Sequence, residues 1–297
     1  MRQTITDLAA EARSEYMSRY AEKNEGKIDG VEYSERNEDG FFISTIDIIN
    51  ENGVRAVGKP CGRYITISFS DITVMGSEEF SRLCTLLSKN IRALCKNIAG
   101  EAKSLLVCGL GNDRLTADAF GQKAAKNVIV TRHLKEEAEE VFKSAGFFDI
   151  CAFYPDVSAH TGLDSSRLLA AAVKQAKPDL VIAADALCAM DAERICRTVQ
   201  LCSAGICPGS GIGNAKGAIN AESMGVPVIA IGVPTVIDAA TLVCDDSERE
   251  AKIGTRGGFF VCPKDIDALT EKLSLLAGFA INRAFHGDFS LEEMMFI

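Results

Sequence analysis

The stretch LLVCGLGNDRLTADAFG, from Leu105 to Gly121, decides the fold. Its four apolar residues, Leu105–Cys108, run directly into Gly109 and Gly111. This predicts a buried strand that ends in a tight turn, because glycine adopts backbone angles that residues with a Cβ avoid. A polar loop then carries Asp118, and the residues after it can form a helix. A strand, a turn and a helix in this order are typical of an open α/β sheet.

A second apolar run, Asp179–Ala184 (DLVIAA), is followed by Asp185 in the same way. Ligands of open α/β sheets bind outside the carboxyl ends of the parallel strands, so we expect Asp118 and Asp185 at the same edge. Two close carboxyl groups do not ionise independently: one keeps a proton, while the other can take a proton from the water that attacks an amide. The two residues are therefore our catalytic candidates. The alternative is that each caps the helix after it.

Segments typical of strands and of helices alternate along most of the chain. Strands are predicted over 41–49, 64–70, 105–108, 127–131, 150–154, 179–184 and 226–231. Helices are predicted over 1–24, 77–98, 119–127, 135–145, 164–175, 191–199 and 265–284, and residues 24–39 are predicted as a polar loop. This pattern predicts an α/β fold, a three-layer α/β/α arrangement with a mostly parallel sheet, plus an N-terminal antiparallel β meander. We expect a single domain over residues 1–297.

Composition excludes several function classes. The 297 residues are 47% hydrophobic and 25% charged, with a formal net charge of −9, which argues against binding nucleic acid or an acidic membrane. The N-terminus lacks the pattern of a secretory signal, and the most apolar window, 225–244, contains prolines and an aspartate and so does not predict a membrane span. Eleven cysteines without a CxxC pair predict buried free thiols in a reducing, cytoplasmic setting.

A glycine-rich loop, CPGSGIGN, covers residues 207–214. It lacks the spacing of a nucleotide-binding loop. We expect it to shape a groove and to offer backbone N–H groups to a peptide or an oxyanion, although a purely structural turn is equally consistent with it. The predicted substrate-binding residues are accordingly Gly209, Ser210 and Gly211 in this loop, together with Gly111 and Asn112 in the first turn.

The three histidines, His133, His160 and His286, lie far apart in the sequence, and none belongs to an HExxH motif. A histidine-rich zinc site is therefore not expected, and we predict no metal and no cofactor. His160 and Thr161, in the loop SAHTG, could approach the two aspartates as substrate-binding residues, or the histidine could simply be solvated. The chain has no GxSxG motif, and a cysteine nucleophile with a histidine partner stays open.

Several segments resemble the germination proteases of spore-forming bacteria, which degrade small acid-soluble spore proteins. They are TDLAAE at 6–11, GKPCGRYITI at 58–67, VCGLGNDRLTADAFG at 107–121, VTRHL at 130–134, KPDLVIAADAL at 177–187, GICPGSGIGN at 205–214, GVPVIAIGVPTVIDAATL at 225–242 and VCPKDID at 261–267. The resemblance implies a fold like that of hydrogenase-maturation peptidases, a homotetramer in the spore core, and an atypical aspartic mechanism. Its two proposed catalytic aspartates fall on Asp118, in TADAFG, and Asp185, in AADAL.

This sequence also departs from the family pattern. Ala117 and Gln122 stand where the family usually has proline, Ser203–Gly205 lacks the usual aspartate, and a segment before VCPKDID is absent. Family members are zymogens with a prosequence before TDLA, whereas five residues precede Thr6 here. Two other functions are compatible with the same carboxylates. One is a metal-dependent peptidase of the hydrogenase-maturation type, and the other is a relative that binds spore proteins without cutting them.

Overall fold

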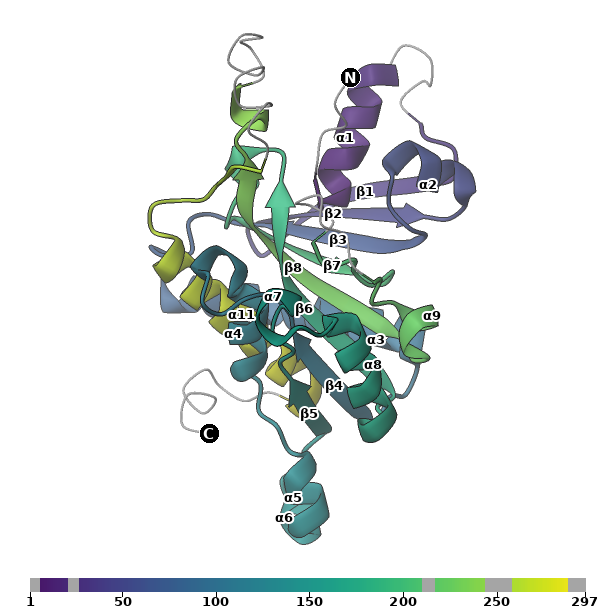
Figure 1. Cartoon of the computed structure of the whole chain (residues 1–297), viewed down its shortest axis with the longest axis vertical. Helices are drawn as coiled ribbons and strands as arrows, with labels where there is room; N and C mark the ends of the chain where they lie inside the picture. Colours follow the sequence, from purple (N-terminus) through teal and green to yellow (C-terminus); the bar gives the residue numbers. More distant parts are fainter. Residues whose placement is uncertain (1–5, 21–26, 210–216, 244–257, 288–297) are drawn as a thin grey trace.

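The computed structural model describes residues 6–20, 27–209, 217–243 and 258–287, and its centre is a nine-stranded sheet (Figure 1). The strands are β1 (Val31–Glu38), β2 (Phe41–Ile48), β3 (Gly62–Ser68), β4 (Ser104–Gly109), β5 (Asp149–Phe153), β6 (Leu180–Ala189), β7 (Thr198–Cys202), β8 (Val228–Asp238) and β9 (Phe260–Val261). Their order is β1-β2-β3-β7-β8-β6-β4-β5, with β9 paired to β8. Strands β8, β6, β4 and β5 are mutually parallel, and the remaining pairs are antiparallel, so the sheet is mixed.

Helices cover both faces of this sheet, which confirms the predicted three-layer α/β/α arrangement (Figure 1). On one face, α3 (Ser77–Ala99), α4 (Phe120–Lys126) and α11 (Ile266–His286) bury alternate residues of β4, such as Leu105 and Val107. On the other face, α8 (Ser165–Ala176) packs against Leu106 and Cys108. The other helices are α1 (Ala9–Tyr20), α2 (Glu51–Val57), α5 (Arg132–Glu137), α6 (Glu139–Ser144), α7 (Ser158–Thr161) and α9 (Ala221–Met224), with short 3₁₀ turns η1 (Thr116–Asp118), η2 (Ala192–Arg194) and η4 (Thr241–Val243).

The N-terminal antiparallel meander is present and is longer than predicted. Residues 31–38, expected to belong to a loop, form β1, which pairs with β2 along its whole length. This strand lies at the sheet edge with most side chains exposed, so it has no alternation of apolar residues to reveal it. The hairpin turn is Asp39-Gly40, and both residues have positive φ, 54° and 90°, as a two-residue turn of this kind requires.

Two further predictions are wrong. Residues 127–131 form no strand, because side chains from elsewhere bind their backbone: Asn282 Oδ1, for example, accepts a hydrogen bond from Ile129 N at 2.8 Å. Residues 191–199 form η2 and the start of β7 instead of a helix. Cys196 has a positive φ of 55° and donates its N–H to Pro234 O at 2.7 Å, which prevents a continuous helix. The predicted helix over 135–145 is also divided, into α5 and α6, at Ala138.

Strand β6 extends well beyond its predicted end, and this changes the setting of Asp185. Strand β4 ends at Gly109, which is paired with Ala184, and Leu110 N then donates to Ala184 O at 2.8 Å. Strand β6 continues beside β8 to Ala189. Asp185 therefore lies within a strand, at the first position where β4 no longer covers the edge of β6.

Most of the cysteines are buried thiols, as predicted. Of the ten that the structure describes, all are free and six are buried: Cys84, Cys95, Cys108, Cys188, Cys196 and Cys202. Cys61 and Cys262 are exposed, and Cys244 lies outside the described residues. Within the described residues, no helix is long and apolar enough to cross a membrane.

Candidate active site

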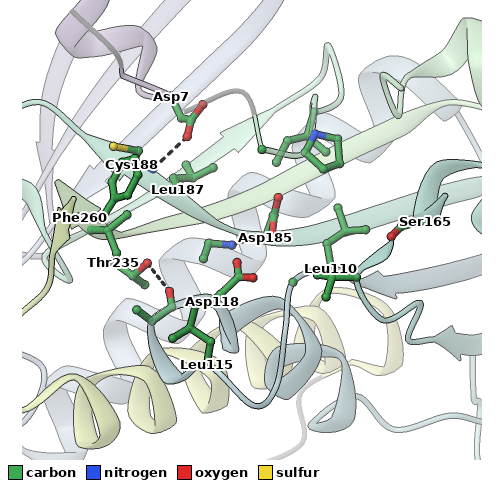
Figure 2. A pocket seen from close by; sticks show the side chains of 18 of the residues that line it. Asp7, Leu110, Leu115, Asp118, Ser165, Asp185, Leu187, Cys188, Thr235 and Phe260 are labelled. Atoms are coloured by element: carbon green, nitrogen blue, oxygen red, sulfur yellow. Dashed lines mark hydrogen bonds between the residues drawn. The ribbon is translucent and has the colours of Figure 1, made fainter. Parts of the chain in front are cut away.

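Asp118 and Asp185 line the same cavity, of about 540 Å³, where β4 ends and β6 continues (Figure 2). Asp118 comes from the end of η1, after β4, and Asp185 comes from β6. Most of the lining is apolar, including Leu110, Leu115, Ala117, Val157, Leu187, Ile206, Pro208, Val236 and Phe260. Two carboxyl groups in an apolar setting interact more strongly than they would in water.

Three contacts of the loop between β4 and α4 fix the position of Asp118. Asn112 N donates to both the backbone oxygen of Asp118, at 3.1 Å, and its Oδ2, at 3.0 Å. Gly111 has φ +92°, and a Cβ there would lie 2.0 Å from Asp118 O, so only glycine allows the chain to pass this close. Thr235 Oγ1, on β8, donates to Ala117 O at 2.6 Å and joins the loop to the sheet.

Asp185 is only 6% exposed and accepts a hydrogen bond at Oδ1 from Ala186 N, at 3.0 Å. Beside it, α4 approaches β6 closely, because a Cβ on Gly121 would lie 2.1 Å from Ala184 O. Burial first, and Asp185 second, raise the pKa of the Cys108 thiol above its ordinary value.

Two of the thiols near the aspartates, Cys108 and Cys188, do not have the properties of a nucleophile. Burial raises the pKa of Cys188, which lines the cavity, to about 12, and the neighbouring carboxyl of Asp7 contributes. The thiolate is the reactive form of cysteine, and Cys108 and Cys188 are both held as thiols at neutral pH.

The predicted substrate-binding residues are divided between the cavity and other places. Gly111 and Gly209 line the cavity, and Asn112 contacts Asp118 through its backbone. His160 and Thr161 do not line it; His160 Nδ1 instead lies 2.9 Å from Asp156 Oδ2 on the exposed side of α7. Two further predicted residues, Ser210 and Gly211, lie outside the described residues.

Asp7 is a third carboxylate in the cavity lining that the sequence did not single out. Asp7 N donates to Cys188 O at 2.9 Å, and Cys188 N donates to Asp7 Oδ2 at 2.9 Å. Glu11, 2% exposed, supports the same segment by accepting hydrogen bonds from Met190 N and Asp191 N. Burial raises the pKa of Glu11. The TDLAAE motif is the sequence signal for this role, but an aspartate just before a helix is equally typical of a helix cap.

Metal-ligating side chains do not cluster in the described part of the chain. Within residues 6–20, 27–209, 217–243 and 258–287, no group of three or more His, Cys, Asp or Glu side chains is placed so that it could hold a metal ion.

An α/β fold with two carboxylates in one cavity, at the carboxyl edge of parallel strands, is an arrangement typical of enzymes. The family model described as germination protease matches residues 7–254. A germination protease of Clostridium perfringens (strain SM101) is 35% identical over 97% of both chains, and one of Caldanaerobacter subterraneus subsp. tengcongensis is 36% identical over 97% of this chain and 96% of its own. The chain belongs to the germination protease family, and it is a peptidase, a hydrolase that acts on peptide bonds.

Two further matches differ in how much they cover. A germination protease of Priestia megaterium is 40% identical over 81% of this chain and 65% of its own length. Among solved structures, a [NiFe] hydrogenase maturation protease, HycI from Thermococcus kodakarensis, covers 64% of this chain and 99% of its own at 18% identity, with a TM-score of 0.33. That score is too low to support any statement about this protein.

Proposed function

We propose that this peptidase is an endopeptidase that cleaves small acid-soluble spore proteins during germination, with Asp118 and Asp185 as its catalytic pair. Family membership supports the reaction, and one observation carries the assignment of the pair: both carboxyl groups line a single cavity. The proposal includes a homotetramer in the spore core, with no cofactor, nucleic acid or membrane as a partner.

The two aspartates differ in burial, and this suggests separate roles. Each accepts a backbone hydrogen bond at a carboxylate oxygen, from Asn112 N to Asp118 and from Ala186 N to Asp185. Burial disfavours the charged form, and Asp185 is buried whereas Asp118 is half-buried. We therefore assign the shared proton to Asp185, which donates a hydrogen bond to the carbonyl oxygen of the scissile amide. Asp118 takes a proton from the attacking water.

Replacing either aspartate by asparagine tests the assignment. Asp118→Asn and Asp185→Asn each remove an acid–base group and should lower cleavage of a purified small spore protein by at least about 100-fold. The matched control is Asp113→Asn in the same loop, because Asp113 is exposed and pairs with Lys126 on the surface. Circular dichroism checks that the variants are folded.

Full activity in both variants would refute the assignment of Asp118 and Asp185 as the catalytic pair. Activity that a chelator abolishes, and that one divalent metal restores, would instead support the metal-dependent alternative, in which the same carboxylates hold the ion.

A further inference from the structure

In the described part of the chain, strand β6 has a neighbour on both edges over only part of its length. Strand β8 accompanies it from Val181 to Ala189, whereas β4 accompanies it only from Leu180 to Ala184. In a strand, the N–H and C=O of one residue point to the same edge, and successive residues alternate between the two edges. The residues that face the β4 edge beyond Asp185 are therefore Ala186 and Cys188.

The chain's own N-terminal segment already uses one of these two positions. Asp7 occupies the edge at Cys188, through the two hydrogen bonds of 2.9 Å described above. The segment is held there by Lys59 Nζ, which donates to Thr6 O at 2.8 Å, and by Gln200 Nε2, which donates to Asp7 O at 3.2 Å. This edge of β6 therefore forms hydrogen bonds with another segment of the chain, through the backbone N–H and the side chain of Asp7.

Among the described residues, Ala186 is the position of this edge that remains between Leu110 and Asp7. It lines the cavity and is the one residue of β6 that is not buried. Its N–H is bonded to Asp185 Oδ1, so the backbone that faces the cavity is joined directly to a proposed catalytic group. All four residues line the cavity, and in the view of Figure 2 Asp185 lies between Asp118 on one side and Asp7 and Cys188 on the other.

We propose that the substrate binds in extended form as an added strand on β6, with its backbone paired to the N–H and C=O of Ala186. This rests on the proposed function, because it places the scissile amide beside Asp185 and Asp118. The step from Ala184 to Cys188 spans roughly 13 Å of extended chain, which is room for three to four substrate residues. The substrate carbonyl takes the place of Asp185 Oδ1 on Ala186 N–H, which frees that carboxyl group to act on the amide.

The apolar lining explains how the cavity would select among substrate sequences. Backbone pairing provides affinity for any sequence. The side chains of the added strand contact the walls of the cavity and provide the selectivity. Leu187, on β6, and Leu115, which is 57% exposed before η1, offer apolar surface on the two walls of the cavity.

Backbone-modified substrates test the proposal without altering the protein. A peptide from the cleaved region of a small spore protein is N-methylated at one amide at a time, and its affinity for the Asp118→Asn variant is measured by fluorescence anisotropy. The added strand pairs with Ala186, whose C=O accepts one substrate N–H, so affinity should fall at least tenfold at one position and change less than threefold at the residues on either side of it.

Substituting Ala186 tests the same contact from the protein side. Ala186→Pro removes the N–H that faces the cavity but none that faces β8, so peptide affinity should fall about tenfold while circular dichroism stays unchanged. If this variant misfolds, the scan with N-methylated peptides still tests whether the substrate adds as a strand to β6. Cleavage of the parent peptide by the wild-type protein, together with equal affinity for all methylated peptides, would overturn strand addition alone. No cleavage by the wild type would overturn the proposed function and this inference with it.

Discussion

Gly111 places the candidate catalytic residue Asp118 through the backbone. Its φ of +92° belongs to the left-handed region, and its Cα faces Asp118 O closely enough that no side chain fits between them. The turn itself could be predicted from the sequence, because an apolar run that ends in Gly-x-Gly is typical of a strand followed by a tight turn. The distance between Asp118 and β6 could not be predicted, since it depends on Thr235, which is 118 positions from its partner Ala117.

Gly111→Ala should therefore impair activity more than stability. The new Cβ would lie 2.0 Å from Asp118 O, so the loop must shift and carry Asp118 away from Asp185. We expect kcat to fall at least about tenfold, with a strain cost of about 1–3 kcal/mol in unfolding free energy. The control is Gly146→Ala, at φ +66° with open space around it, which should cost about 1–2 kcal/mol and leave kcat unchanged. Similar kcat values for both variants would contradict this role of Gly111.

Elements with a strong local signal were predicted best. Helix α8 is predicted over 164–175 and lies at Ser165–Ala176, because Asp164 is a good N-cap and the segment after it is rich in the helix-favouring residues Leu and Ala. The helix predicted over 191–199 is wrong, because partners far away in the sequence fix the conformation of this segment. Cys196 donates a hydrogen bond to β8, and Gln200, in β7, accepts a hydrogen bond from Ala9 N at 2.8 Å. Non-local pairing of this kind leaves little trace in a short stretch of sequence.

The N-cap of α8 can be tested directly. Asp164 accepts hydrogen bonds from Ser166 N, at 2.9 Å, and Arg167 N, at 3.1 Å, and α8 buries Leu169 against the sheet. Asp164→Ala should lower the unfolding free energy by about 1 kcal/mol in urea titrations. Asp265 stands at the N-cap of α11 without a capping hydrogen bond, so Asp265→Ala is the matched control and should cost clearly less. Equal losses would show that the Asp164 cap contributes nothing specific.

The whole molecule assembles its cavity from parts of the chain that are far apart in sequence. The N-terminal segment, the β4–α4 loop, β6, the loop at 206–209 and β8 all contribute to the lining. The sequence predicted the strand that leads to Asp118 and the first part of the strand that carries Asp185, and the family motifs marked the same two residues. It did not predict that β6 continues to Ala189 or that Asp7 returns to pair with it, because both depend on how the antiparallel and parallel parts of one sheet are joined.

Helix α11 carries a buried histidine, His286, in its last turn. His286 Nδ1 accepts a hydrogen bond from Phe148 N, at 3.2 Å, and the other ring nitrogen, Nε2, lies 3.0 Å from Ile129 O and donates to it. This arrangement requires the neutral ring, and burial lowers the pKa of His286 below its ordinary value of 6.5. Phe147 packs edge-on against the ring, 5.6 Å between centroids. Protonation of His286 at Nδ1 would therefore break the hydrogen bond from Phe148 N.

Stability should consequently fall as the pH is lowered through the ordinary histidine range. The unfolded chain binds a proton at His286 below about pH 6.5, whereas the folded chain does not until its lower pKa is reached, so the unfolding free energy decreases by up to about 1.4 kcal/mol per pH unit in that interval. His286→Gln should lower stability at pH 7.5 but lose this part of the slope between pH 7.5 and 5.5, as measured by urea titration at each pH. His133→Gln is the matched control, because His133 is exposed on α5, and it should leave the unfolding free energy at pH 7.5 within about 0.5 kcal/mol of the wild-type value. A slope that survives in His286→Gln would mean that other groups bind the proton.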